Sequence, residues 1–271
     1  MSSTRVLRMG PSVLGALVMV TLLSSPAWAQ DSPVVVVTGA VDLTNQYNFR
    51  GIRQNTEGVS IQPYIDFGFT PYKGDGGLKS VTINTGLWNA VNSQLSDNKY
   101  YEMDYYATLG LGFSKASLGM TYTSYTSPAD LFAHVKELAF KLGIDDSSAL
   151  GKGALKPYAL LAFELTDDGQ ADAGDAKGKY LELGIAPGYA GAKASLAVPV
   201  KVGLSAGDYY EFGGKDETLG YVSVAGIVTV PINAHSNIHF GGEFQAFGDS
   251  VKAYNGQDTV GIASVGLGFA F

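Results

Sequence analysis

The sequence contains no cysteine. Disulfides and thiolate metal sites are therefore excluded, and hydrogen bonds and packing must hold the fold. Beyond its first 29 residues, the chain has no apolar run near 18 residues, which excludes a membrane-spanning helix there. Basic residues are also scarce, since 18 Lys and Arg stand against 25 Asp and Glu. Nucleic acid is not an expected partner, because phosphate binding requires basic clusters.

The first 29 residues have the pattern of an export signal. Arg5 and Arg8 precede the apolar run 13–23, and Ala27 and Ala29 form an A-x-A cleavage pattern. That apolar run is about half as long as the ~20 residues that a spanning helix needs. We expect residues 1–29 to be a cleaved signal peptide and residues 30–271 to form one exported domain.

Apolar residues alternate with polar or small residues along most of the remaining chain. From Tyr101 to Phe113 every second residue is apolar or aromatic. Glycine, at 35 residues of 271, is roughly twice as frequent as the usual ~7%. A period of two indicates strands rather than helices, and the runs exceed the ~5–6 residues of an ordinary strand. Twelve segments carry the pattern: 35–49, 59–70, 78–90, 99–113, 116–126, 134–145, 154–166, 179–190, 193–204, 218–230, 236–247 and 259–271.

Long and short connectors alternate between these segments. A membrane barrel gives this alternation, because long loops lie on one side of the bilayer and short turns on the other. A soluble β-sandwich or solenoid is the alternative, since the strands of a sandwich also alternate. Strands that match or exceed the ~9–11 residues needed to cross a bilayer favour the barrel. We expect an all-β fold, a transmembrane antiparallel up-and-down β-barrel of about twelve strands, located in the outer membrane after export through the periplasm.

Aromatic residues gather near the ends of the predicted strands, where girdles at the membrane interface belong. Those expected in the girdles are Phe69, Tyr101, Tyr125, Tyr189, Phe247 and Phe271. The chain stops on Phe271, in the outward phase of its last segment. An alternating last strand that ends in Phe resembles the signal that outer-membrane barrels present to their assembly machinery. We expect this machinery and outer-membrane lipid to be partners.

The segment 37–69 reads VTGAVDLTNQYNFRGIRQNTEGVSIQPYIDFGF. It resembles the opening of the TorF-type porin family of Gram-negative outer membranes. The first hairpin of that family has a strand, a Y-x-F-R-G motif, a polar segment with Gln and a second alternating strand. The matching residues here are Tyr47, Phe49, Arg50, Gly51, Ile52 and Gln54. The stretch GLWNAVNS at 86–93 resembles the family's third strand. The resemblance implies location and fold, and no catalytic or binding residue follows from it.

The inward phase of the predicted strands is rich in carboxylates, with a few lysines among them. Rings of Asp and Glu attract cations, so the pattern predicts a lumen that favours cations. The alternative is a cross-paired interior ladder without selectivity. The candidate lumen-lining residues are Asp42, Asp66, Glu102, Asp104, Glu137, Lys141, Glu164, Glu182, Lys201 and Glu243.

The predicted function is a porin-like channel for passive passage of ions or small polar solutes. One alternative is a structural barrel with a plugged lumen. Another is a lipid hydrolase, which would need Ser, His and an orienting group together at one rim. His134 is expected near the outer rim, and His235 and His239 near the periplasmic rim, with no evident pairing. The acidic segment 167–175 does not fit the calcium-loop spacing, so we expect a solvated loop there. No catalytic residue, cofactor or metal site is predicted.

Overall fold

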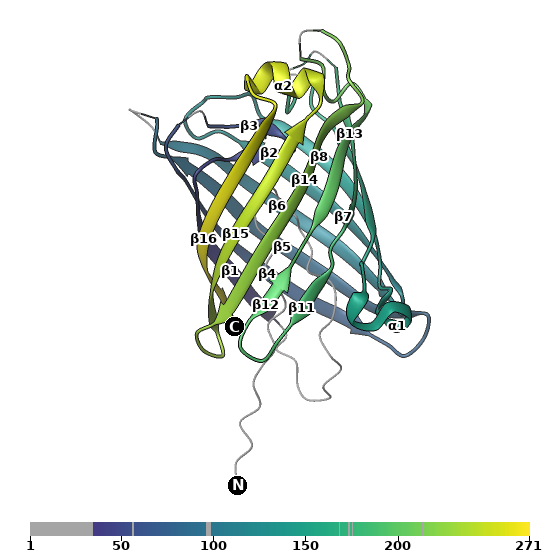
Figure 1. Cartoon of the computed structure of the whole chain (residues 1–271). Coiled ribbons are helices and arrows are strands. Elements are labelled where there is room, and N and C mark those ends of the chain that lie inside the picture. The colour runs from purple at the N-terminus through teal and green to yellow at the C-terminus, as the bar shows by residue number, and fades with distance from the viewer. Residues whose placement is uncertain are drawn as a thin grey trace.

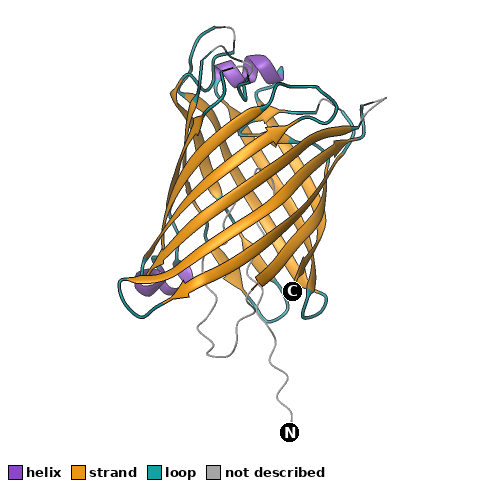
Figure 2. Ribbon diagram, turned by 180° about the vertical axis from the view of Figure 1, so that it is seen from behind, coloured by secondary structure: helices purple, strands orange, loops and turns teal. Residues whose placement is uncertain are grey.

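The computed structural model describes residues 35–55, 57–95, 99–167, 169–172, 174, 176–212 and 214–271. The predicted signal peptide therefore lies outside the described residues. The described chain forms a closed antiparallel β-barrel (Figures 1 and 2). None of its helices is long and apolar enough to cross a membrane.

Consecutive strands of the wall pair with one another. In the order around the barrel they are β1 (Val35–Thr44), β4 (Ser60–Lys73), β5 (Leu78–Asn92), β6 (Tyr100–Phe113), β7 (Ala116–Thr126), β8 (Val135–Ile144), β9 (Tyr158–Glu164), β10 (Lys179–Ile185) with β11 (Gly188–Ala190), β12 (Ser195–Ala197) with β13 (Val200–Gly207), β14 (Leu219–Pro231), β15 (Ser236–Phe247) and β16 (Thr259–Ala270). Pro187 separates β10 from β11, and Pro199 separates β12 from β13, because proline has no N–H for the ladder. Each pair counts as one strand of the wall, so the barrel has twelve strands, as predicted.

The last strand closes the barrel against the first. In the β1–β16 pairing, Thr38 lies opposite Ala270 and Thr44 lies opposite Ser264. The backbone N–H of Phe271 also donates to the carbonyl of Val37, at 2.8 Å. Every strand of the wall therefore has two neighbours, which leaves no long open edge.

The two ends of the barrel differ. One end carries both Val35 and Phe271, and we call it the terminus end. Its connectors are short, except for 145–157, which contains α1 (Ser147–Leu150) and the 3-10 turn η1 (Gly151–Gly153). The other end, called the loop end, carries the described residues of the connectors within 45–59, 93–99, 127–134, 165–178, 208–218 and 248–258. The last of these contains α2 (Asp249–Asn255), which covers part of this end (Figure 1).

Side chains alternate across the wall as the period of two requires. On β6, Tyr105 and Leu109 are exposed, whereas Asp104 and Thr108 are buried. On β1, Val41 and Leu43 are exposed on either side of buried Asp42. The outer face is thus apolar and the inner face polar, which is the reverse of a soluble barrel.

Two predicted strand boundaries and part of the girdle prediction need correction. Residues 45–49 do not extend β1, because the chain turns into the barrel after Thr44. The predicted strand 154–166 is shorter, since β9 begins only at Tyr158. The girdle prediction is also wrong for Tyr101, Tyr125 and Phe247, which contact groups inside the barrel. Phe69, Tyr189 and Phe271 are exposed.

Candidate functional site in the barrel interior

A short hairpin folds from β1 into the barrel, and we call residues 45–55 the crossing hairpin. Its two strands are β2 (Asn48–Phe49) and β3 (Ile52–Arg53). The turn residues Arg50 and Gly51 both have positive φ, 49° and 84°, as a two-residue type I′ turn requires. Such a conformation is uncommon for a residue other than glycine, so surrounding contacts must hold Arg50 in place.

Those contacts lie on the opposite wall and on the connector after β13. The Arg50 guanidinium donates to both oxygens of Glu137 on β8, at 2.5 and 2.7 Å. It also donates to the Tyr209 hydroxyl at 2.9 Å and lies 4.1 Å from the centre of the Tyr180 ring. In the strand order β8 is far from β1 on either path around the wall. The hairpin therefore crosses the lumen and is fixed at its tip by a buried, bidentate ion pair.

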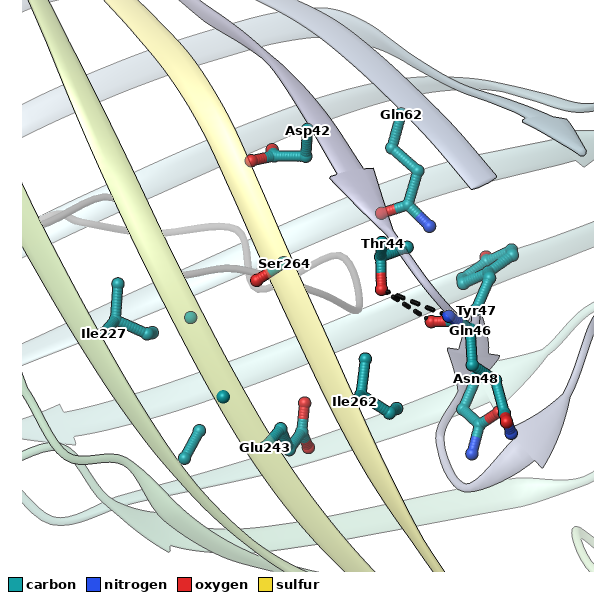
Figure 3. A pocket seen from close by; sticks show the side chains of 13 residues that line it. Asp42, Thr44, Gln46, Tyr47, Asn48, Gln62, Ile227, Glu243, Ile262 and Ser264 are labelled. Carbon is teal, nitrogen blue, oxygen red and sulfur yellow. Dashed lines mark hydrogen bonds between the residues drawn. The ribbon is translucent and has the colours of Figure 1, made fainter. Parts of the chain in front are cut away.

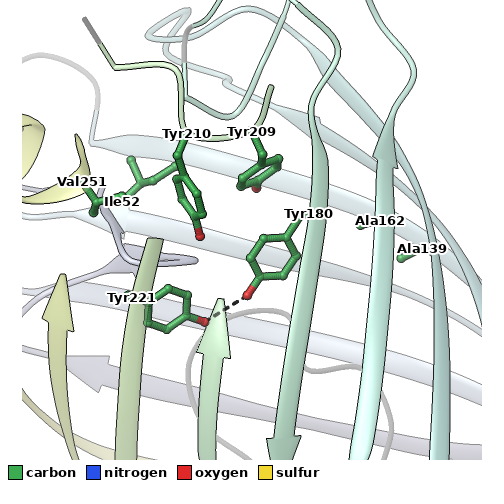
Figure 4. Packing of buried hydrophobic residues seen from close by; sticks show 8 residues of the cluster. All are labelled: Ile52, Ala139, Ala162, Tyr180, Tyr209, Tyr210, Tyr221 and Val251. Atoms are coloured by element: carbon green, nitrogen blue, oxygen red, sulfur yellow. Dashed lines mark hydrogen bonds between the residues drawn. The ribbon is translucent and has the colours of Figure 1, made fainter. Parts of the chain in front are cut away.

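Two connectors of the loop end also hold the hairpin in place. Asn255 at the end of α2 accepts the backbone N–H of Arg53 and donates to the carbonyl of Gly51. The Tyr210 hydroxyl, from the connector after β13, donates to the carbonyl of Arg50 at 2.9 Å. Figure 4 shows the packing at this contact, in which Ile52 of the hairpin lies near Val251 of α2 and Tyr210. Tyr209, Tyr180 and Tyr221 belong to the same buried cluster.

The acidic connector 165–178 takes part in the same assembly. Asp172 accepts the backbone N–H of Glu211 at 2.7 Å and that of Gly174 at 2.8 Å. Burial raises the pKa of Asp172, while these two hydrogen bonds oppose the shift. The expectation of a merely solvated loop is wrong at this residue, because Asp172 joins two connectors. The described residues contain no cluster of three or more His, Asp or Glu that could hold a metal ion.

The base of the hairpin covers two of the predicted lumen residues. The Tyr47 hydroxyl donates to Glu102 at 2.9 Å, and the Tyr47 ring lies 5.2 Å from that of Trp88. Tyr101 bends inward and donates to Gln54. As a result Glu102 is only 5% exposed and Asp104 only 2%.

Other predicted lumen residues also have firm partners. Glu182 accepts hydrogen bonds from the hydroxyls of Tyr158, Tyr180 and Tyr221. Lys141 lies over the Tyr158 ring, with its ammonium nitrogen 4.1 Å from the ring centre, and Lys201 lies 5.6 Å from the Tyr221 ring. Glu164 accepts the backbone N–H groups of Ala171 and Gly178, at 2.7 Å each.

The remaining three carboxylates have fewer partners. Asp42 contacts Nε2 of the fully buried His239 at 2.5 Å, and Asp66 accepts a hydrogen bond from Asn84 at 2.9 Å. Glu243 accepts one hydrogen bond, from Gln245, also at 2.9 Å.

A cavity of about 40 Å³ lies between the start of the crossing hairpin and strands β14 to β16. It has room for a few water molecules, each of which needs ~10–15 Å³ of such space. Figure 3 shows Asp42, Thr44 and Gln62 on one side of it and Glu243 on the other.

Sequence reasoning missed the residues that organise this interior: Arg50, Tyr209, Tyr210 and Asn255. One signal was available, because Gly51 follows Arg50 between apolar Phe49 and Ile52, and glycine is a common turn residue. Nothing local in the sequence shows that this hairpin folds inward.

The structure brings together one serine–histidine pair that the sequence did not reveal. Ser124 Oγ and His134 Nε2 lie 2.7 Å apart on the outer face near the loop end. Burial and the charge of Lys136 lower the pKa of His134. Within the described residues no carboxylate or amide contacts the other ring nitrogen of His134. His235 instead stacks on Phe271 at the terminus end, and His239 pairs with Asp42.

A closed twelve-stranded barrel with an apolar outer face and a polar interior is the architecture of outer-membrane β-barrel proteins. Among solved structures, the chain is similar to an outer membrane channel from Pseudomonas putida F1, with a TM-score of 0.54 and 11% identity over 92% of this chain and 100% of the other. It also matches outer membrane phospholipase A from Escherichia coli, with a TM-score of 0.49 and 14% identity over 86% and 92% of the two chains. The NanC porin matches with a TM-score of 0.46 and 10% identity over 88% and 98%.

At these identities, the likeness to the Pseudomonas putida channel shows the shared fold. No family model matches the sequence. No curated protein matches it either.

Proposed function

We propose that the protein is an outer-membrane channel for ions or small polar solutes, with a preference for cations. The observation that carries the proposal is the charge of the inner face. Arg50, Lys141 and Lys201 are the positive groups described there. Against them stand the eight carboxylates Asp42, Asp66, Glu102, Asp104, Glu137, Glu164, Glu182 and Glu243. An acidic passage raises the local concentration of cations and excludes anions.

The proposal includes a location and a route. The apolar outer face suits lipid, and the sequence pattern of residues 1–29 suits export. Phe271 at the barrel seam would be read by the assembly machinery, and the N-terminal motif supports membership of the TorF-type porin family. The channel would act without chemistry, as a passive pore and not as an enzyme.

The crossing hairpin supports a narrow pore, because it fills the part of the lumen towards β8. The same hairpin is also what a plugged, structural barrel would contain, so conductance separates the two functions. We expect the folded protein to give discrete channel openings in planar lipid bilayers. The reversal potential in a KCl gradient should have the sign of cation preference. Bilayers that stay silent while holding folded barrels would favour the plugged barrel.

The Ser124–His134 pair is the one observation that favours a lipid hydrolase. A hydrolase also needs a group that orients the histidine and donors for the oxyanion, and neither is described around this pair. Release of fatty acid from phospholipid vesicles by the folded protein, lost in Ser124→Ala, would establish that activity. We expect no release above that of the Ser124→Ala variant.

A further inference from the structure

The carboxylates inside the barrel differ sharply in what they can still bind. Five of the eight are committed to the protein itself. Glu137 is neutralised by Arg50, Glu182 accepts from three tyrosines, and Glu164 accepts from two backbone N–H groups. Glu102 and Asp104 lie buried under the base of the crossing hairpin. A passing solute would therefore meet few of the acidic groups.

Asp42 and Glu243 are different because both border the cavity beside the hairpin (Figure 3). Each has one oxygen engaged, Oδ1 of Asp42 by His239 and Oε1 of Glu243 by Gln245. The second oxygen of each accepts no hydrogen bond from the residues that the structure describes. The rest of the wall is mixed. Thr44, Gln46, Gln62 and Ser264 offer amide and hydroxyl groups, whereas Ala225, Ile227 and Ile262 are apolar.

We propose that this cavity is a binding subsite for a small cationic solute, such as a metal cation or a primary ammonium group, on its way through the barrel. The inference deepens the proposed channel function and rests on it. Two carboxylate oxygens facing one space supply the negative charge, and the neighbouring amide and hydroxyl oxygens can replace the water of a hydrated cation. Lys201 interacts electrostatically with Glu243, which limits the attraction and keeps the site weak enough for release.

The subsite also changes which residues should set selectivity. Glu102 and Asp104 are two residues apart on β6, and both belong to its inner-face phase. Their burial beneath Tyr47 and Trp88 removes them from the cavity. Charge selection should depend on Glu243 and Asp42, which border the same cavity from β15 and β1, with β16 between these two strands.

The absence of native cysteine permits a direct test. Ser264→Cys places a single thiol at the cavity and leaves both carboxylates intact. The folded barrel in detergent is treated with a cationic methanethiosulfonate carrying a primary ammonium group, which is the proposed class of solute, or with an anionic one carrying a sulfonate. Each rate is divided by the rate of the same reagent with free mercaptoethanol. We expect the corrected labelling rate of the cationic reagent to exceed that of the anionic reagent about fivefold or more. One unit charge a few ångströms away changes the local concentration of a charged reagent by about this factor in water.

Adding Glu243→Gln to Ser264→Cys should reduce the ratio of the two corrected rates at least twofold, whereas adding Glu102→Gln should leave it unchanged. Folding of each variant is checked by its heat-modifiable mobility on gels. A ratio near one, no reaction with either reagent, or a ratio that follows Glu102 and not Glu243 would overturn the subsite. Because labelling needs no conductance, charge-selective labelling of a barrel that is silent in bilayers would refute the channel and leave the cation subsite standing.

Discussion

Arg50 and Glu137 form a bidentate ion pair that joins the tip of a hairpin leaving β1 to strand β8 across the lumen. The pair is buried, and the guanidinium also rests on the Tyr180 ring. A charge in such a place is stable only while its partner remains, so the hairpin has one well-defined position.

Loss of this ion pair should release the crossing hairpin and widen the pore. In Glu137→Gln the Arg50 charge stays buried without its counter-charge, which costs ~3–5 kcal/mol for a buried pair. We expect larger or more frequent openings in planar bilayers and a lower stability of the barrel in urea.

The double variant Arg50→Gln/Glu137→Gln provides the control. It also frees the hairpin, so conductance should again rise. It leaves no unpaired charge, so most of the lost stability should return. Unchanged conductance in both variants would show that the hairpin does not obstruct the pore.

Gly266 on β16 makes room for the Asp42–His239 contact. A Cβ at this position would collide with Asp42 Oδ1 and His239 Nε2. Gly266→Ala should therefore displace the pair and lower the free energy of unfolding by ~1–3 kcal/mol, the usual cost of overpacking. Gly226 on β14 is the matched control, because its Cβ would enter open space on the outer face. Urea unfolding that affects both variants equally would contradict the steric argument.

The barrel could be predicted from the sequence because it depends on local patterns and on pairing between consecutive strands. Alternation with period two gives the strand and its two faces, and pairing of consecutive strands gives the topology. The fate of residues 45–55 could not be predicted in this way. Arg50 bonds to Glu137, and Asn255 bonds to Gly51, although these residues are far apart in the sequence. The alternation of apolar and polar residues gives no information about such distant contacts.

The same limit applies to the candidate site. The inner-face phase of Glu102 and Asp104 follows from alternation, but their burial depends on Tyr47 of the hairpin. Tyr125 belongs to the inner-face phase of β7, as buried Thr123 does, so alternation alone places it inside the barrel. Tyr101 lies beside an irregularity in the β5–β6 register, and its hydroxyl donates to Gln54 of the hairpin.

Phe271 should matter more for assembly than for final stability. Its backbone N–H and C=O both bond Val37 at the seam, and its exposed ring stacks on His235 at 5.2 Å. Deleting Phe271, or changing it to Asp, should lower the amount of folded barrel in the outer membrane. Phe271→Tyr, which keeps the ring, should assemble normally. Equal amounts of folded protein for the deletion and the wild type would contradict a role in assembly.

The final prediction concerns the outer face at Tyr105, whose side chain is exposed between those of buried Asp104 and Tyr106. If this face contacts lipid, Tyr105→Lys places a charge in the bilayer, at a cost of up to ~2–4 kcal/mol near the midplane. We expect less heat-modifiable barrel in the membrane fraction for this variant. Tyr105→Phe, which keeps the apolar ring, should insert like the wild type. Neutralising the neighbouring inner-face residues by Glu102→Gln and Asp104→Asn should also leave insertion intact, since neither side chain meets lipid. A silent Tyr105→Lys combined with failed insertion of the neutralised pair would mean that lipid contacts the opposite face of β6.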